Sequence, residues 1–165
     1  MKNKGFSLIE VTVAIALIGI MASIGVPKLR KQIAIGRDTK AIAILGTLRT
    51  ASELYFIETG ESPANVTGTP EEGSTTIEAL KKLEPYLDEK TFKEIEDGNL
   101  EIGGSRTTNP DNSQVEETIN YGGTIGLTFK NPNITDSSGS DGIYIWFQPA
   151  ENKEYDTKGN KWTEY

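Results

Sequence analysis

Glu10 is a candidate functional residue, because it is the one charged side chain in the apolar run from Phe6 to Val26. A carboxylate in apolar surroundings is costly, by about 2.5–3.5 kcal/mol at the centre of a bilayer and by less near its edge. A residue kept at that cost is a candidate for function and needs a partner. The chemistry open to Glu10 is ionic pairing with an amine inside an apolar environment.

Other reactive groups are few. The chain has no histidine and no cysteine, which removes the commonest general base and metal ligand and excludes a disulfide framework. One loop gathers Asp136, Ser138, Ser140 and Asp141. Calcium takes six to eight oxygen ligands, and two carboxylates are few for such a site. We interpret the loop as a solvated turn and predict no metal site.

No pattern typical of an enzyme is present in the sequence. Glu116 and Glu117 form a charge pair without an identifiable acid–base role, and we interpret them as surface residues. The sequence contains neither a G-x-S-x-G nucleophile elbow nor a phosphate-binding loop. We therefore predict that the chain is not an enzyme and takes no cofactor.

The apolar run around Glu10 is long enough to span a membrane. Its residues, from Phe6 to Val26, reach about 30 Å as a helix, the thickness of a bilayer's hydrocarbon core. A secretory signal peptide has a shorter apolar region and ends at an A-x-A-like site, of which residues 22–24 are a poor version. An ordinary membrane anchor would leave Glu10 unexplained. Both alternatives are therefore weaker than a span with a functional carboxylate.

The sequence KGFSLIE and the apolar run after it resemble the class III leader of type IV pilins and of the pseudopilins of type II secretion. The resemblance implies that a membrane peptidase cleaves between Gly5 and Phe6 and that Phe6 becomes N-methylated. Glu10 is then the fifth residue of the mature chain. Because Phe6 and Glu10 are four residues apart and share one face of a helix, we predict that the new amine is the partner of Glu10 and that Glu10 sets the axial register of assembly.

The same resemblance implies a structural subunit that polymerises through its N-terminal helix into a type IV pilus. The implied partners are further copies of the chain, the prepilin peptidase and methylase, the inner-membrane assembly platform, minor pilins and, before assembly, membrane lipid. The precursor belongs to the bacterial cytoplasmic membrane and the assembled subunit to an extracellular pilus. Two alternatives stay open: a major pseudopilin of a type II secretion system, which forms a periplasmic filament, and a single-span membrane-anchored binding domain.

Charge is distributed unevenly along the chain. Residues 1–50 carry eight Lys or Arg and two acidic residues, a net charge of +6, whereas residues 51–165 carry nine against 22, a net charge of −13. The two parts of neighbouring subunits could therefore attract each other. Phosphate repulsion disfavours nucleic-acid binding by the acidic part alone.

Basic residues stand on both sides of the apolar run. Lys2 and Lys4 precede it, and Lys28, Arg30 and Lys31 follow it closely. The positive-inside rule alone leaves the orientation undecided. The family resemblance places the N-terminus inside and the C-terminal part outside.

Gly19, Gly25 and Pro27 make one stretch of the predicted helix weak. Relative to alanine, each glycine costs about 1 kcal/mol in a helix interior and proline about 3 kcal/mol. A simple kink at Pro27 is the plain interpretation. In type IV pili with a similar pattern, the segment between such a glycine and proline unwinds on assembly, and the resemblance implies this here.

Helical periodicity continues beyond Pro27. Apolar residues recur every three or four positions through Ala41, Ile44, Leu48 and Ala51, which predicts an amphipathic helix that ends near Gly60. Two short helices are predicted next, one beginning at a capping box formed by Thr75 and Glu78 and ending near Leu83, the other capped by Asp88.

The remainder is predicted to form strands. Candidates are Leu100–Ile102, Gly123–Lys130, Gly142–Gln148 and Trp162–Tyr165, the last two pairing as a C-terminal hairpin. The fold class is α+β, with a long N-terminal α-helical spine packed on a small antiparallel β-sheet head. The predicted segments are a cleaved leader (1–5), a transmembrane or filament-core helix (6–27), an amphipathic helix (28–59), a connecting region (60–98), and the sheet with its hairpin (99–165).

Overall fold

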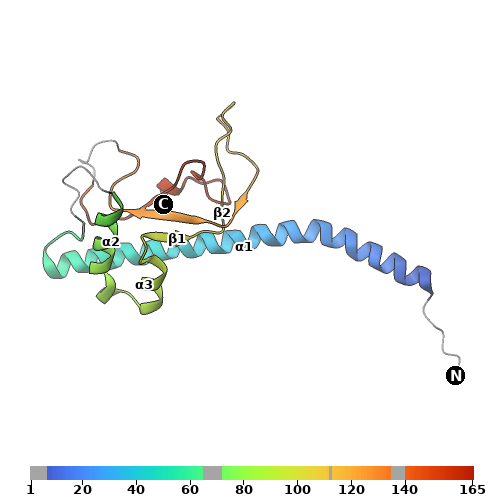
Figure 1. The fold of residues 1–165 in the computed structure, drawn as a ribbon, viewed down its shortest axis with the longest axis horizontal. Helices are drawn as coiled ribbons and strands as arrows, with labels where there is room; N and C mark the ends of the chain where they lie inside the picture. Colours follow the sequence, from blue (N-terminus) through green and yellow to red (C-terminus); the bar gives the residue numbers. More distant parts are fainter. Residues whose placement is uncertain (1–6, 65–71, 112, 135–139) are drawn as a thin grey trace, which may run out of the picture. The chain divides into compact units, whose positions relative to one another are not determined.

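A computed structural model describes residues 7–64, 72–111, 113–134 and 140–165 of the chain (Figure 1). The chain divides into two compact units, Met1–Ile33 and Ala34–Tyr165, and we call the second unit the head. The fold is α+β, as predicted: a long N-terminal helix with an apolar stretch and a small antiparallel sheet.

Helix α1 runs from Leu8 to Thr59 and contributes to both units. It ends as the sequence predicts, because Gly60 adopts a left-handed conformation with φ of 73° and donates its N–H to the carbonyl of Phe56 over 2.8 Å. Glycine takes this conformation without the strain that a Cβ causes, so Gly60 supplies the C-cap.

Within the head, α1 buries one face. Ala41, Ile44, Leu48 and Ala51 are buried, which confirms the predicted apolar face, and Leu45 joins them. These side chains meet the sheet and the short helices in one hydrophobic core. Its larger members from beyond α1 are Leu80, Leu83, Ile95, Leu100, Ile102, Ile125, Leu127, Phe129, Ile145, Phe147 and Trp162.

Three short helical segments follow α1: α2 (Glu72–Lys82), the 3₁₀ turn η1 (Glu84–Tyr86) and α3 (Glu89–Ile95). The predicted N-cap of α2 at Thr75 is wrong, because the helix already begins at Glu72. The predicted cap of α3 is confirmed, since the Asp88 carboxylate accepts the Thr91 N–H over 3.0 Å.

The main sheet has three antiparallel strands in the order β1 (Asn99–Glu101), β4 (Thr124–Thr128) and β5 (Trp146–Gln148). Leu100 lies opposite Ile125, and Leu127 opposite Phe147, so buried side chains share one face of the sheet. A second, two-stranded ribbon pairs β2 (Gly104–Ser105) with β3 (Asn120–Tyr121). Figure 1 shows β1 and β4 lying along the part of α1 that belongs to the head.

The predicted strand at Gly142–Gln148 is only partly present, because the strand begins at Trp146. Gly142 has a φ of 71°, and the Asp141 carboxylate accepts the N–H groups of Ile143 and Tyr144, both over 2.9 Å. Those N–H groups are engaged in a turn and are not available to a neighbouring strand.

The predicted strand at Trp162–Tyr165 is wrong. Residues Trp162–Glu164 form a 3₁₀ turn, and a single bridge between Tyr155 and Lys161 closes the loop before it. The turn buries the Trp162 ring completely, with its centre 5.2 Å from that of Phe147 in an edge-to-face arrangement. Burial of this large ring favours the turn over a strand, which would point alternate side chains away from the core.

Arg49 ties the C-terminal segment to α1 inside the head. Its Nε donates to the carbonyl of Ile145 over 2.8 Å and its Nη2 to the carbonyl of Tyr165 over 2.7 Å. The guanidinium carbon also lies 4.0 Å from the centre of the Tyr144 ring, a cation–π contact. Burial lowers the pKa of Arg49 from its usual value, although the arginine stays charged.

Candidate functional site

The N-terminal part of α1 is an apolar surface that nothing in its own unit covers. Every residue from Ser7 to Ile33 is exposed; Leu8 is 82% exposed and Met21 74%. In the described part of the chain, α1 is the one helix long and apolar enough to cross a membrane. A contiguous apolar surface of this kind calls for lipid or for other protein.

Glu10 sits at the beginning of this helix and already has a hydrogen-bond donor within the chain. Its Oε2 accepts the backbone N–H of Ser7 over 2.8 Å, while the Glu10 N–H donates to the Ser7 carbonyl over 3.1 Å. The carboxylate arm of a capping box, S-x-x-E, has this geometry. The carboxylate thus satisfies a backbone donor that the helix leaves unpaired, and it places a negative charge at the positive end of the helix dipole.

This contact was not predicted from the sequence, although residues 7–10, S-L-I-E, match the capping-box pattern S-x-x-E. The bond means that Glu10 is not an isolated carboxylate before assembly. Its second oxygen, Oε1, has no protein donor among the described residues, so one oxygen remains for a further partner. Gly5 and Phe6 lie outside the described residues, so the cleavage site and the pairing with the Phe6 amine stay predictions.

The three predicted helix-weakening residues all lie within the regular part of α1. Gly19, Gly25 and Pro27 are helical in the single chain, and a Cβ built on either glycine would meet no atom within 4 Å. Ser23, four residues before Pro27, donates its hydroxyl to the Ile20 carbonyl over 2.7 Å. The predicted unwinding concerns the assembled filament, and it stays a prediction.

Of the polar loop that we interpret as a solvated turn, the structure describes only the end with Ser140 and Asp141. Asp136 and Ser138 lie outside the described residues. The Asp141 carboxylate binds backbone N–H groups, and the Ser140 hydroxyl accepts the N–H of Asn131 over 2.9 Å. Within the ranges that the structure covers, no three His, Cys, Asp or Glu side chains gather as a metal ligand set.

Comparison with known proteins gives a consistent result. Residues 1–26 match the model of the prokaryotic N-terminal methylation motif. A fimbrial protein of Pseudomonas aeruginosa is 29% identical over 142 residues, which is 86% of this chain and 83% of that protein. No solved structure matches the chain significantly.

Two further relatives match mainly over a shorter stretch. A fimbrial protein of Neisseria meningitidis is 33% identical over 75 residues, covering 46% of this chain and 44% of that protein. The type IV major fimbrial protein FimA of Dichelobacter nodosus is 36% identical over 56 residues, covering 34% and 36%. The methylation motif at the N-terminus and the fimbrial names of these relatives support a similarity to type IV pilins, in a chain that has a long helix, apolar where the motif lies, and a small antiparallel sheet.

Proposed function

We propose that this chain is the structural subunit of a type IV pilus, polymerising through the N-terminal part of α1 after its leader is removed. The observation that carries the proposal is the exposed apolar surface from Leu8 to Val26, which includes the capping carboxylate of Glu10 and lies within the matched methylation motif. Such a surface can be stored in a membrane and then buried against copies of itself. The role is structural, without catalysis.

The proposed order of assembly steps follows from what can cover the apolar surface of α1 at each step. In the membrane, lipid covers the helix, and the cut between Gly5 and Phe6 exposes an α-amine. Extraction then requires that neighbouring helices replace the lipid, because burial of apolar surface is the main favourable term in association. The amine and Glu10 make that exchange register-dependent, since a subunit at the wrong height leaves a carboxylate buried without a partner.

A pilus is favoured over a type II secretion pseudopilus, because the relatives reported above carry fimbrial names. Localisation follows from the same reasoning: the precursor is anchored in the bacterial inner membrane, and the assembled subunit is outside the cell. The prepilin peptidase, the assembly platform and minor pilins are proposed partners.

The test is an intact-mass measurement on filaments sheared from the cell that makes this protein. We expect the mass to correspond to loss of Met1–Gly5 and gain of one methyl group. The Gly5→Val variant should accumulate unprocessed precursor in the membrane, because a larger side chain obstructs the peptidase at the cut. Filaments built from uncleaved chains, or no filaments at all from wild-type protein, would refute the proposal.

A further inference from the structure

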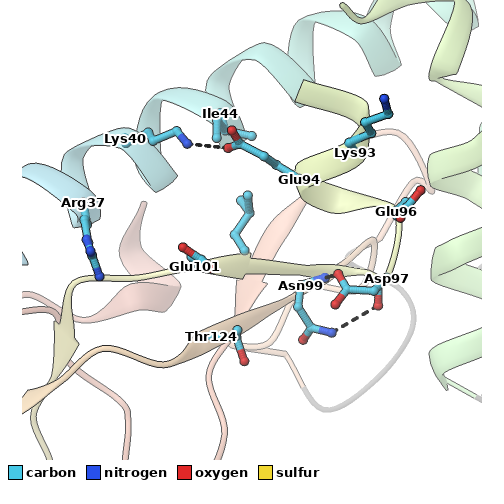
Figure 2. Close-up of a pocket in the computed structure, with 11 residues that line it drawn as sticks. Arg37, Lys40, Ile44, Lys93, Glu94, Glu96, Asp97, Asn99, Glu101 and Thr124 are labelled. Atoms are coloured by element: carbon cyan, nitrogen blue, oxygen red, sulfur yellow. Dashed lines mark hydrogen bonds and ion pairs between the residues drawn. The ribbon is translucent and has the colours of Figure 1, made fainter. Parts of the chain in front are cut away.

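The head carries a groove of about 640 Å³ between α1, α3 and the first strand of the sheet (Figure 2). Its floor is apolar, formed in part by Ile44 of α1 and Leu100 of β1, and its walls are charged. All residues that line it belong to the head. The groove is therefore formed entirely within the head.

Two of the cations near the groove are already neutralised. Lys40 of α1 pairs with Glu94 of α3 over 2.6 Å, and Figure 2 shows this pair at the upper wall of the groove. Lys93, which also lines the groove, pairs with Glu89 of α3 over 2.6 Å. These lysines are thus not available to balance the remaining acidic groups.

Three acidic side chains of the groove remain without an ion pair in the part of the chain that the structure covers: Glu96, Asp97 and Glu101, all exposed. Asp97 accepts the backbone N–H of Asn99 over 3.0 Å, which leaves its charge uncompensated. Arg37 is the remaining unpaired cation among the lining residues, so the groove keeps an excess of negative charge. It is suited to a cationic partner.

The complementary segment is present on the chain itself. Lys28, Arg30 and Lys31 follow the apolar run of α1, are exposed, and have no ion pair within the described ranges. Lys28 and Lys31 are three residues apart on a helix and share a face. An acidic groove on one copy and an unpaired basic face on another are complementary in charge, and the hollow admits long lysine side chains.

We propose that the groove of one subunit receives the basic face of a neighbouring subunit's α1, with Lys31 opposite Glu101. This inference rests on the proposed polymerisation, and it names a head-to-helix contact outside the apolar core of the filament. Charge pairs at an interface mainly select partner and register, whereas apolar burial supplies the attraction. The contact would therefore fix the height at which each subunit stops.

The absence of cysteine gives a clean test. A Lys31→Cys, Glu101→Cys double variant should form disulfides from subunit to subunit when its sheared filaments are oxidised. A non-reducing gel should then show a ladder of trimers and longer species that collapses under reductant. The matched control is Lys31→Cys with Glu151→Cys, because Glu151 is an exposed acidic residue outside the groove. The control should remain monomeric.

A charge-swap series keeps the proposal testable if cysteines disturb assembly. Glu101→Lys and Lys31→Glu should each lower the sheared polymer fraction roughly tenfold, the effect of losing about 1.4 kcal/mol at an interface. The double swap should restore most of it, while Glu151→Lys should have no effect.

Outcomes that overturn the contact are distinct from those that overturn polymerisation. Normal filaments in which only monomers are found, an equal ladder from the control pair, or single-variant defects that the double swap does not rescue would each refute the groove contact. A Lys31→Glu variant depleted from the membrane itself, and not rescued by Glu101→Lys, would assign the basic face to lipid head groups. Loss of wild-type filaments would instead contradict the proposed function.

Discussion

The carboxylate of Asp38 accepts the backbone N–H of Thr157, 119 residues further along the chain, over 3.0 Å. Its other oxygen accepts the N–H groups of Gly103 and Gly104 over 2.7 and 3.3 Å. Asp38 is only 3% exposed. One side chain of α1 thereby joins the junction of β1 and β2 to the C-terminal loop, and the buried charge is compensated by three backbone donors.

Asp38→Asn should destabilise the head by about 1–3 kcal/mol, because an amide NH₂ group would face a backbone N–H and leave buried donors unpaired. The measurement is urea unfolding of the full chain in detergent, followed by tryptophan fluorescence. Asp111→Asn is the matched control, since Asp111 is exposed in a turn, and its unfolding should change by less than about 0.5 kcal/mol. Equal effects of the two substitutions would contradict the role of Asp38.

Gly103 should not tolerate any side chain. A Cβ built there would lie 1.9 Å from the carbonyl oxygen of Ala34, part of the α1 backbone, which cannot move aside. Gly103→Ala should therefore separate the strand junction from α1 and lower the midpoint of thermal unfolding markedly. Gly36→Ala, with open space around its Cβ, should instead stabilise α1 by about 0.5–1 kcal/mol. A Gly103→Ala protein as stable as wild type would refute this packing.

Alkaline pH should loosen the C-terminal loop. The Tyr165 hydroxyl donates to the Asp156 carboxylate over 2.6 Å, and burial followed by this bond raises the pKa of Tyr165 to about 12. Because the pKa in the folded state lies above the unfolded value of about 10, its contribution to stability is complete below pH 10 and is lost as pH rises towards 12. Tyr165→Phe should lack this component of the decline. If the free energy of unfolding falls equally for wild type and Tyr165→Phe from pH 9 to 12, the role of the Tyr165 hydroxyl is contradicted.

Acidic pH should also destabilise the C-terminal loop. Burial raises the pKa of Asp156, but hydrogen bonds from Tyr165 and Asn160 outweigh burial and leave that pKa below its usual value. A carboxyl with a lowered folded pKa stabilises the fold above about pH 4 and loses that contribution as pH falls through the folded pKa. Asp156→Asn should flatten the acid limb of the stability profile, measured by urea unfolding between pH 2 and 6. An unchanged acid limb would contradict the prediction.

The Glu10→Gln variant tests whether assembly needs the negative charge of Glu10 or only its capping hydrogen bond. Glutamine can also occupy the N3 position of a capping box and accept the Ser7 N–H, so the helix should begin as in wild type. If the Phe6 amine is the true partner in the filament, Gln and Val variants should be almost equally absent from sheared filaments while being cleaved normally. The measured quantity is polymer normalised to processed protein in the membrane. A Gln variant that assembles fully beside a defective Val variant would show that only the cap matters.

Pro27→Ala should straighten and stiffen α1 in the filament. The stretch between Gly19 and Pro27 is helical in the single chain, and we expect it to lose regular hydrogen bonds on assembly because glycine and proline make it the weakest part of the helix. A cryo-electron microscopy map of wild-type filaments should show the break, and a map of the variant should show a shorter one. A continuous straight helix through this stretch in wild-type filaments would disprove the idea.

The features that depend on neighbouring residues could be predicted from the sequence alone. The apolar run with Glu10, the buried face through Ala41 and Leu48, the cap at Gly60 and strand β4 follow from periodicity and local backbone preference, which act within a few residues. The capping bond from Ser7 to Glu10 also depends on neighbouring residues, and the S-x-x-E pattern indicates it.

The features that depend on contacts between distant residues could not be predicted from the sequence. Asp38 lies three residues before Ala41, on the apolar face of the helix, but no local pattern identifies its partners, because its three donors come from positions 65 to 119 residues away. Trp162 has a strand-like composition around it, yet contact with Phe147 makes a 3₁₀ turn the lower-energy choice. The groove exists only where α1, α3 and β1 meet. Local propensities amount to fractions of a kcal/mol per residue. Burying one large ring contributes several times more, and leaving the buried donors of a carboxylate unpaired costs about 1–3 kcal/mol, so the distant contacts prevail.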